Sequence, residues 1–251
     1  MRARQGTYEL TIDNFDKKNL IKSACHDNIY IHKDISLNMP ICRYIPIDYL
    51  IDMLKTQKMY FANRLSMNDK REQGIKEDLS AMQSLTFMYR NRKKAEKEAD
   101  KVYRLNELAY STCISCWTKN IEESIMFWHC YGQTTCMMLT NMQDLIESIV
   151  STPYTLIIAP IQYIERERTE QIHEKIFTKY VSYKDEQEVR LCILSNNHNV
   201  KLDVDCAKLI HKLTINPFFN KSYQQFLKET LENKYKYLEG KILYSHLLEY
   251  K

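Results

Sequence analysis

Glycine is scarce in this chain of 251 residues, which has only Gly6, Gly74, Gly132 and Gly240. Loops that cradle phosphate need several glycines within a few residues, so a Walker loop and a dinucleotide-binding turn are both absent. The sequence also lacks a Gly-x-Ser-x-Gly motif, which a nucleophile elbow requires. These absences exclude protein kinases, P-loop NTPases and Rossmann dehydrogenases.

Long hydrophobic runs are missing as well. No apolar stretch approaches the roughly 20 residues that a membrane-spanning helix needs. The first nine residues lack the apolar centre of a signal peptide. We therefore expect a cytoplasmic protein that does not enter a membrane. The net charge of +4 comes from scattered lysines and arginines, which is only a weak indication of nucleic-acid binding.

Cysteine is present, but without the spacing of a complete zinc site. Cys113 and Cys116 form one Cys-x-x-Cys pair, which His129, Cys130 or Cys136 could complete. However, the segment 111–117 is predicted to be a strand, which points the first pair to opposite faces. No second Cys-x-x-Cys follows. We expect buried free thiols and no bound metal.

The hydrophobic pattern predicts an α+β fold with a mixed or antiparallel sheet, flanking helices and a helical insertion. Residues 1–38 are expected to be an N-terminal extension, and residues 39–251 a single domain. Strands are predicted at 40–44, 59–62, 111–117, 135–139, 156–163, 186–194, 200–204, 210–215 and 242–246. Helices are predicted to start at Pro46 and to span 122–131, 142–150, 167–177 and 221–233.

The helical insertion is expected at about 75–108. Within it, residues 90–101 are charged on nearly all sides, which is typical of a solvated helix or hairpin that projects from the body. A surface that binds a partner protein or nucleic acid is the alternative interpretation.

Three charged side chains near the start of one predicted strand form the main candidate site. Glu186, Glu188 and Arg190 alternate along the strand and would share one face, which looks into solvent or a cleft. Two adjacent carboxylates repel, so one pKa should be raised unless Arg190 or a substrate compensates the charge. The simpler alternative is an exposed sheet face with a cross-strand ion pair.

The order of the sequence motifs resembles the bacterial domain-of-unknown-function family 2971, from about Met39 to the C-terminus. The matching pieces are Arg43-Tyr44, Tyr60-Phe61-Ala62-Asn63, Asn68-Asp69, Ser115-Cys116-Trp117, Phe127-Trp128 with Tyr131, and Lys179, Tyr183, Glu186, Glu188 and Arg190. The chain departs from the family at two places. Lys70 and Arg71 replace Pro-Phe, and Cys130 stands where the family has histidine.

The same layout is similar to that of ADP-ribosyltransferases, in which a late strand carries Glu-x-Glu. This resemblance implies that Glu188 is the central catalytic residue and that Glu186 handles the incoming acceptor. It further implies that NAD, as substrate, is bound by Arg43, Tyr44, Tyr60, Asn68 and Arg190. For Arg43 and Tyr44, a pair that lies over the edge of the sheet is the alternative.

The chemistry suits these residue types. Cleavage of the bond between nicotinamide and ribose builds positive charge on the ribose carbon, which a fixed carboxylate stabilises in the transition state. The acceptor could be a protein, a nucleic acid or water, and by family analogy the role is that of a toxin or phage-defence effector. Two other functions remain open. One is a metal-dependent nuclease that uses Glu186 and Glu188 with Lys179 or Lys184, and the other is a non-enzymatic adaptor.

Overall fold

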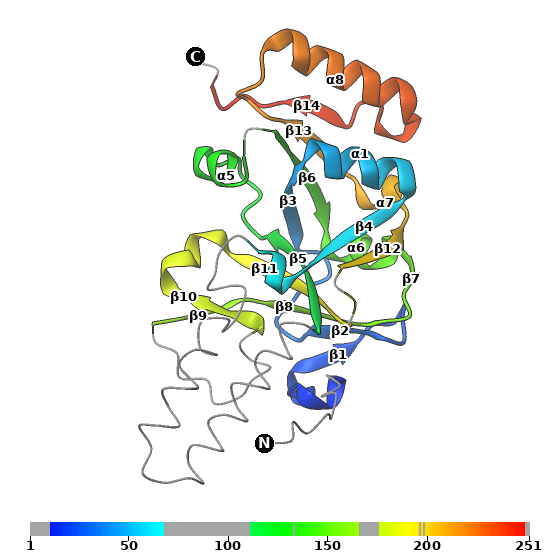
Figure 1. The fold of residues 1–251 in the computed structure, drawn as a ribbon, viewed down its shortest axis with the longest axis vertical. Coiled ribbons are helices and arrows are strands. Elements are labelled where there is room, and N and C mark those ends of the chain that lie inside the picture. The colour runs from blue at the N-terminus through cyan, green and yellow to red at the C-terminus, as the bar shows by residue number, and fades with distance from the viewer. Residues whose placement is uncertain are drawn as a thin grey trace, which may run out of the picture.

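The computed structural model describes residues 11–67, 111–132, 134–165, 176–195, 197 and 199–248. Within these ranges the fold is α+β, with a mixed sheet of 12 strands. The strands of its main path follow one another along the long axis of the molecule, from β14 near one end to β1 near the other (Figure 1). Its strands are β1 (Leu20–Lys22), β2 (Ile29–His32), β3 (Pro40–Pro46), β4 (Lys58–Asn63), β5 (Thr112–Thr118), β6 (Thr135–Asn141), β7 (Ile149–Ser151), β8 (Thr155–Pro160), β11 (Glu188–Leu194), β12 (Asn199–Val204), β13 (Lys212–Ile215) and β14 (Ile242–Tyr244).

The main path of the sheet has the order β1-β2-β8-β11-β5-β3-β6-β13-β14, and β4, β12 and β7 form a branch from β5. A separate parallel pair consists of β9 (Gln162–Ile164) and β10 (Thr178–Tyr180). The helices are α1 (Ile47–Thr56), α5 (Ile125–Cys130), α6 (Met142–Ser148), α7 (Cys206–Leu209) and α8 (Lys221–Lys234).

The sheet forks at β5, because β3 and β4 both pair with the same edge of this strand. β3 meets β5 at Cys42 and Thr118, whereas β4 meets it at Ala62 and Ile114 and again one residue further on. The other edge of β5 pairs with β11 along its whole length. The two branches therefore diverge over the middle of β5, and α1 connects them.

α1 follows directly from its sequence. Pro46 supplies a fixed φ of −56° just before the first turn, where a missing N–H leaves no bond unmade. Its buried side chains recur at helical spacing and lie against the sheet; they are Ile47, Leu50, Met53 and Leu54. The helix ends at Gln57, which adopts a left-handed conformation with φ 54°.

β11 lies at the centre of the sheet, and all seven of its residues are buried. Leu191 and Ile193 face the larger hydrophobic cluster, together with Trp117 from β5. Cys192 faces a second, smaller cluster on the opposite side, which also contains Ile157 from β8. The strand is thus packed on both faces, as strands near the middle of a covered sheet are.

Most predicted strands and helices are confirmed, with ends shifted by a few residues. The predicted helix 142–150 instead ends at Ser148, and Ile149–Ser151 forms strand β7. The predicted strand 156–163 is two strands, β8 and β9, which are separated at Ile161. The predicted strand 210–215 is preceded by the short helix α7 and begins only at Lys212.

The segment expected as an N-terminal extension contributes to the sheet. β2 pairs in parallel with β8, and β1 pairs antiparallel with β2. The described part of this segment, residues 11–38, therefore adds two strands to the sheet. Residues 75–108 of the expected insertion lie outside the described residues, as do Asn68 and most of the predicted helix 167–177.

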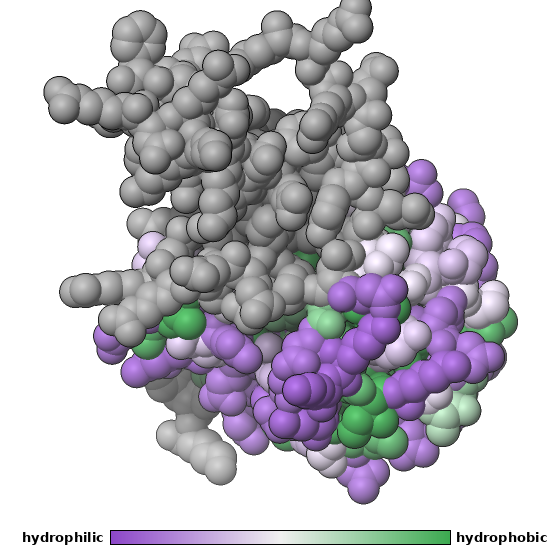
Figure 2. Space-filling view, turned by 90° about the horizontal axis from the view of Figure 1, so that it is seen from below, coloured by the Kyte–Doolittle hydropathy of each residue, from purple (hydrophilic) through white to green (hydrophobic). Residues whose placement is uncertain are grey.

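Hydrophobic residues form small separate patches on the face seen from the β1 end of the molecule, and polar side chains lie between them (Figure 2). In the part of the chain that the structure describes, none of the helices has the length and apolar character to cross a membrane.

Candidate functional site

Glu188 and Arg190 form a buried ion pair at the start of β11. Arg190 Nε donates to Glu188 Oε1 at 2.7 Å, and Arg190 Nη2 donates to Glu188 Oε2 at 3.2 Å. A third nitrogen, Nη1, donates to the carbonyl oxygen of Ile176 at 2.6 Å. The side chains are only 4% and 1% exposed. The expectation that this face looks into solvent or an open cleft is therefore wrong for these two residues.

Glu188 is ionised despite its burial. Desolvation alone would raise its pKa, but the positive charges of Arg190 and Lys179 and their hydrogen bonds lower the pKa to about 2. The repulsion between the neighbouring carboxylates is thus compensated by Arg190, the exception that the prediction allowed for, and also by Lys179. Glu188 therefore carries a negative charge at neutral pH, and a carboxylate with so low a pKa is a weak general base.

Lys179 of β10 joins the two glutamates. Its Nζ atom lies 2.6 Å from Glu186 Oε2 and 2.7 Å from Glu188 Oε2. It also lies 5.3 Å from the centre of the Tyr183 ring, within the range of a cation–π contact. The sequence singled out Lys179 only as a motif match and a possible phosphate contact. Its position between both carboxylates depends on tertiary structure and has no local sequence signal.

Glu186 does not belong to the strand, contrary to prediction. It ends the 3₁₀-helix η5 (Val181–Glu186), and Gln187 follows in the left-handed region with φ 43°. This conformation changes the direction of the chain between the two glutamates, yet both carboxylates reach Lys179. Glu186 is 24% exposed, so it is the more accessible of the two.

Neighbouring elements fix the backbone around the two glutamates. Thr118 Oγ1 donates to the carbonyl oxygen of Glu186 at 2.6 Å, and the backbone N–H of Glu188 donates to Tyr163 Oη at 2.8 Å. The N–H of Lys119 donates to the carbonyl oxygen of Gln187 at 3.1 Å. This short segment is therefore held from both β5 and β9.

Arg43 lies on β3, at the fork of the sheet. Its Nη1 atom donates to Ser115 Oγ at 2.9 Å, and Trp117 Nε1 donates to the same oxygen at 3.1 Å. Arg43 is half-buried, and the structure gives it no ion pair with a carboxylate among the described residues. Burial lowers its pKa, but a guanidinium still remains charged.

Arg43 and Tyr60 line the same pocket, as the sequence analysis expects for two residues of one site. The pocket lies between β3, α1, β4 and η3 (Arg64–Ser66) and has a volume of about 350 Å³. Tyr60 stacks on Tyr49 with ring centres 5.5 Å apart, and its hydroxyl donates to Asn199 Oδ1 at 2.6 Å. The pocket combines a cation with an aromatic wall.

Tyr44 does not face this pocket. It is buried in a third hydrophobic cluster with Phe127 and Trp128, whose rings meet it edge-on. One of its faces stacks on Tyr131, with ring centres 5.5 Å apart and planes within 8° of parallel. Because these contacts surround the ring, the expected contact between Tyr44 and NAD is wrong. The alternative, a residue that packs over the sheet, describes it better.

Tyr131 interacts electrostatically with Arg43 and with both glutamates. It is 44% exposed, yet desolvation of its hydroxyl raises its pKa, and the nearby charges of Glu186 and Glu188 raise it further. Tyr131 also acts electrostatically on Arg43. In the sequence, Tyr131 matches a motif of the family but has no predicted role. Its exposure beside both groups makes it a candidate site residue.

The predicted residues thus form two neighbouring groups. One is the pocket with Arg43 and Tyr60, and the other is the ion-pair cluster with Glu186, Glu188 and Arg190. Neither glutamate is among the described residues that line the pocket. Arg190 is fully engaged by Glu188 and the backbone, so its expected contact with NAD is replaced by a role in holding Glu188.

The cysteines and one pair of acidic residues near the end of β12 are side chains of the types that bind metals, and the structure gives them other contacts. All eight cysteines are free thiols, and Cys113 and Cys116 pack into clusters on opposite faces of the sheet. Of the acidic pair near the end of β12, Asp203 binds Lys58 and Asp205 caps α7. No group of three or more His, Cys, Asp or Glu side chains suited to a metal occurs in the described ranges.

Comparison with known proteins gives one distant structural similarity. No family model matches the chain, and no curated protein matches it. Among solved structures, that of Thermus sp. 2.9 DarT in complex with ADP-ribosylated ssDNA aligns with a TM-score of 0.36 and 10% identity. The alignment covers 79% of this chain and 90% of that one. At this TM-score, the similarity does not establish a shared fold.

Proposed function

We propose that this chain cleaves NAD, as an ADP-ribosyltransferase or an NAD glycohydrolase with an ADP-ribosyltransferase-like fold. We also propose that the chain belongs to the domain-of-unknown-function family 2971, whose motifs its sequence resembles. It requires a subsite for the anionic and aromatic parts of NAD and a fixed negative charge near the ribose. In this proposal the pocket with Arg43 and Tyr60 is the candidate for the first, and Glu188 of the ion-pair cluster is the candidate for the second.

The observation that carries the proposal is the state of Arg43. A half-buried guanidinium with five donors makes one hydrogen bond to a neutral hydroxyl and faces a pocket. Leaving such a charge without a counter-charge is unfavourable unless a ligand supplies one. The pyrophosphate of NAD offers oxygens that match the planar fork of arginine.

The aromatic wall supports the same assignment. Tyr49 and Tyr60 are already stacked, and an additional planar ring can extend such a stack. The pocket volume is at the lower end of the roughly 300–1,000 Å³ usual for ligand sites, which suits one part of a dinucleotide rather than the whole.

The carboxylates supply the electrostatic part of the reaction. In this proposal the permanently ionised Glu188 stabilises positive charge on the ribose carbon, which requires a charge and no proton transfer. Glu186, which is more exposed, orients or deprotonates the acceptor. Tyr131, which is exposed and interacts electrostatically with both glutamates, is the further residue that we propose to contact the substrate. The acceptor is a protein, a nucleic acid or water, and the role is that of a cytoplasmic toxin or phage-defence effector.

The experiment is a nicotinamide-release assay with NAD, run with a metal chelator and then with magnesium. We expect release in both conditions and a fall of roughly 100-fold or more in Glu188→Gln. Glu186→Gln should reduce transfer to an acceptor while hydrolysis to free ADP-ribose continues. Glu147→Gln is the matched control, because Glu147 also pairs with a lysine, Lys208, but lies on α6 away from the cluster.

The outcomes separate the three functions. Nicotinamide release by Glu188→Gln at the wild-type rate would remove that residue from the reaction. Magnesium-dependent cleavage of nucleic acid, lost in both glutamate variants, would support the nuclease instead. Activity in neither assay would favour the adaptor, whose expected binding segment, 75–108, could then be tested with candidate partners.

A further inference from the structure

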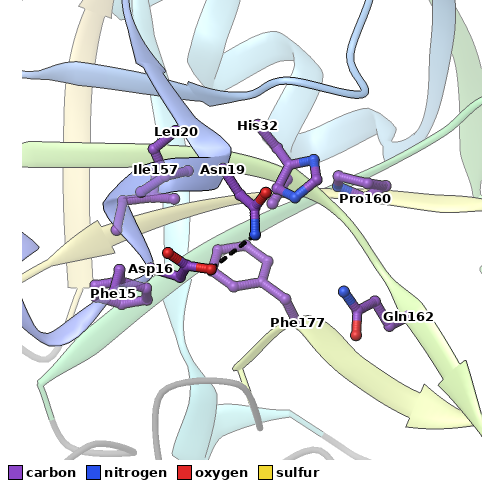
Figure 3. A pocket seen from close by; sticks show the side chains of 10 residues that line it. Phe15, Asp16, Asn19, Leu20, His32, Ile157, Pro160, Gln162 and Phe177 are labelled. Carbon is purple, nitrogen blue, oxygen red and sulfur yellow. Dashed lines mark hydrogen bonds between the residues drawn. The ribbon is translucent and has the colours of Figure 1, made fainter.

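A second pocket lies on the other side of β11 from the fork, over β8. It is lined by Phe15, Asp16, Asn19, Leu20, His32, Ile157, Ala159, Pro160, Gln162 and Phe177 (Figure 3). We call it the Phe15–Phe177 pocket. Ala159 is the cross-strand partner of Arg190, so the pocket adjoins the ion-pair cluster without sharing its residues.

The base of this pocket is apolar and partly aromatic. Phe15, Ile157 and Ala159 are buried, and Phe177 is half-buried. The rings of Phe15 and Phe177 meet edge to face, with centres 6.3 Å apart and planes at 69°. The half-buried ring of Phe177 lies among the polar side chains in Figure 3 and is available to contact a flat ligand.

The size of the pocket limits the ligand to one ring. Its volume is about 130 Å³. A cavity of roughly 150 Å³ in another protein accepts benzene, so a single six-membered ring with a small substituent is the matching size.

The rim supplies hydrogen-bonding groups of both kinds. Asp16 accepts hydrogen bonds from the N–H of Lys18 at 3.1 Å and from Asn19 Nδ2 at 2.8 Å, which leaves further lone pairs on its carboxylate. Because Nδ2 of Asn19 is directed to Asp16, the amide oxygen of Asn19 remains as an acceptor. His32 Nδ1 lies 3.3 Å from the backbone nitrogen of Asp34, and the imidazole ring adds a further polar group to the rim.

We propose that the Phe15–Phe177 pocket binds a six-membered nitrogen heteroaromatic ring that carries an N–H donor next to an acceptor, as in a carboxamide or an amino-pyrimidine. A plain hydrocarbon ring would leave the rim groups desolvated and unpaired. A ring bearing a carboxylate would meet the negative charge of Asp16. Free nicotinamide and a cytosine base share the required chemistry and are the two sources to distinguish.

The test uses the full chain and direct binding, so it is independent of NAD cleavage. Nicotinamide, nicotinate and cytidine are titrated separately, with binding followed by ligand-observed NMR. We expect nicotinamide, cytidine or both to bind with a dissociation constant on the order of millimolar, as suits so small a ligand. Nicotinate should bind at least about tenfold more weakly than nicotinamide, because its carboxylate is repelled.

Two variants locate the binding. Asp16→Asn removes the charge but preserves the cap of η2 (Lys17–Asn19), because asparagine caps as well as aspartate. Phe177→Leu keeps the apolar volume and removes the ring. Each should weaken binding about fivefold or more. Asp27→Asn is the control, since Asp27 pairs with Lys22 in the connection between β1 and β2 and does not line the pocket.

Binding of nicotinamide alone identifies a pyridine carboxamide as the ligand, and binding of cytidine alone identifies a nucleobase. The proposal is overturned if neither compound binds or if nicotinate binds as well as nicotinamide. It is also overturned if the pocket variants bind like the wild type. Loss of NAD cleavage in a separate assay would not affect this result.

Discussion

Arg190 binds Glu188 through two nitrogen atoms, and both side chains are almost fully removed from solvent. A buried pair of this kind is strongly destabilised when one partner is removed, because the other charge stays behind uncompensated. The pair therefore has to be tested as a unit, and stability and catalysis have to be measured separately.

Removal of either partner alone should lower stability sharply. We expect Glu188→Leu to cost about 3–5 kcal/mol in the free energy of unfolding. The double change Glu188→Leu with Arg190→Met should cost clearly less than the sum of the single changes, since no buried charge is orphaned. Urea unfolding of the four proteins measures the coupling. Additive effects would show that the two side chains do not depend on each other.

Stability should depend on Glu188 at acid pH. Its folded-state pKa of about 2 lies below the ordinary value of 4.5, so the ionised form stabilises the folded protein. This contribution, roughly 3 kcal/mol, is fully present above pH 4.5 and is lost as the pH falls toward 2. The difference in unfolding free energy between wild type and Glu188→Gln should therefore shrink on acidification. A difference that stays constant between about pH 6 and 3 would contradict the assignment.

Arg43 should contribute to NAD affinity through charge and geometry. Arg43→Ala removes a charge-assisted contact worth about 1.5–3 kcal/mol, which corresponds to a rise in dissociation constant of roughly 10- to 150-fold. Arg43→Lys should restore only part of the affinity, because an ammonium cannot make the planar contact. Calorimetric titration with NAD measures both. Lys22→Ala, which removes an exposed charge on β1, is the control and should bind NAD normally.

Gln187 should tolerate only residues that accept its backbone conformation. At φ 43° a β-branched side chain is strongly disfavoured, so Gln187→Val should destabilise the protein by about 1–2 kcal/mol. It should also reduce nicotinamide release, because the change would move Glu186 away from Lys179. Gln187→Gly and Gln187→Asn should retain both properties. Thermal unfolding and the release assay distinguish these cases, and a fully active Gln187→Val would refute the positioning role.

The strands of the centre could be predicted because their residues alternate or run as apolar stretches, and Thr112–Thr118 and Glu188–Leu194 lie within two residues of the expected bounds. The fork could not be predicted. The fork forms because β3 and β4 pair with different positions along one edge of β5. Pairing between segments that are distant in the sequence leaves no local pattern. For the same reason the connection between the N-terminal hairpin and β8 was missed.

The site was predicted in its residue types but not in its geometry. The spacing of Glu186 and Glu188 correctly indicated that their side chains lie close together. The left-handed conformation of Gln187 between them could not be predicted, because glutamine usually avoids this conformation. The burial of Arg190 could not be predicted, because charged residues are normally exposed. It is explained by the ion pair with Glu188 on the same strand. Tyr44 and Tyr60 are both aromatic strand residues, and only packing decides which of them faces a pocket.

The pairing of the N-terminal hairpin with β8 decides where the protein can be shortened. β2 covers the outer edge of β8, whose residues Leu156 to Ala159 are four buried apolar positions in a row. A shortened protein that starts at residue 39, where the domain was expected to begin, would leave this edge exposed and able to pair with another copy. We expect that fragment to aggregate, because its hydrophobic edge strand is uncovered. A protein that keeps residues 11–38 should stay soluble. The N-terminal hairpin thus covers an edge strand that could otherwise pair with another chain.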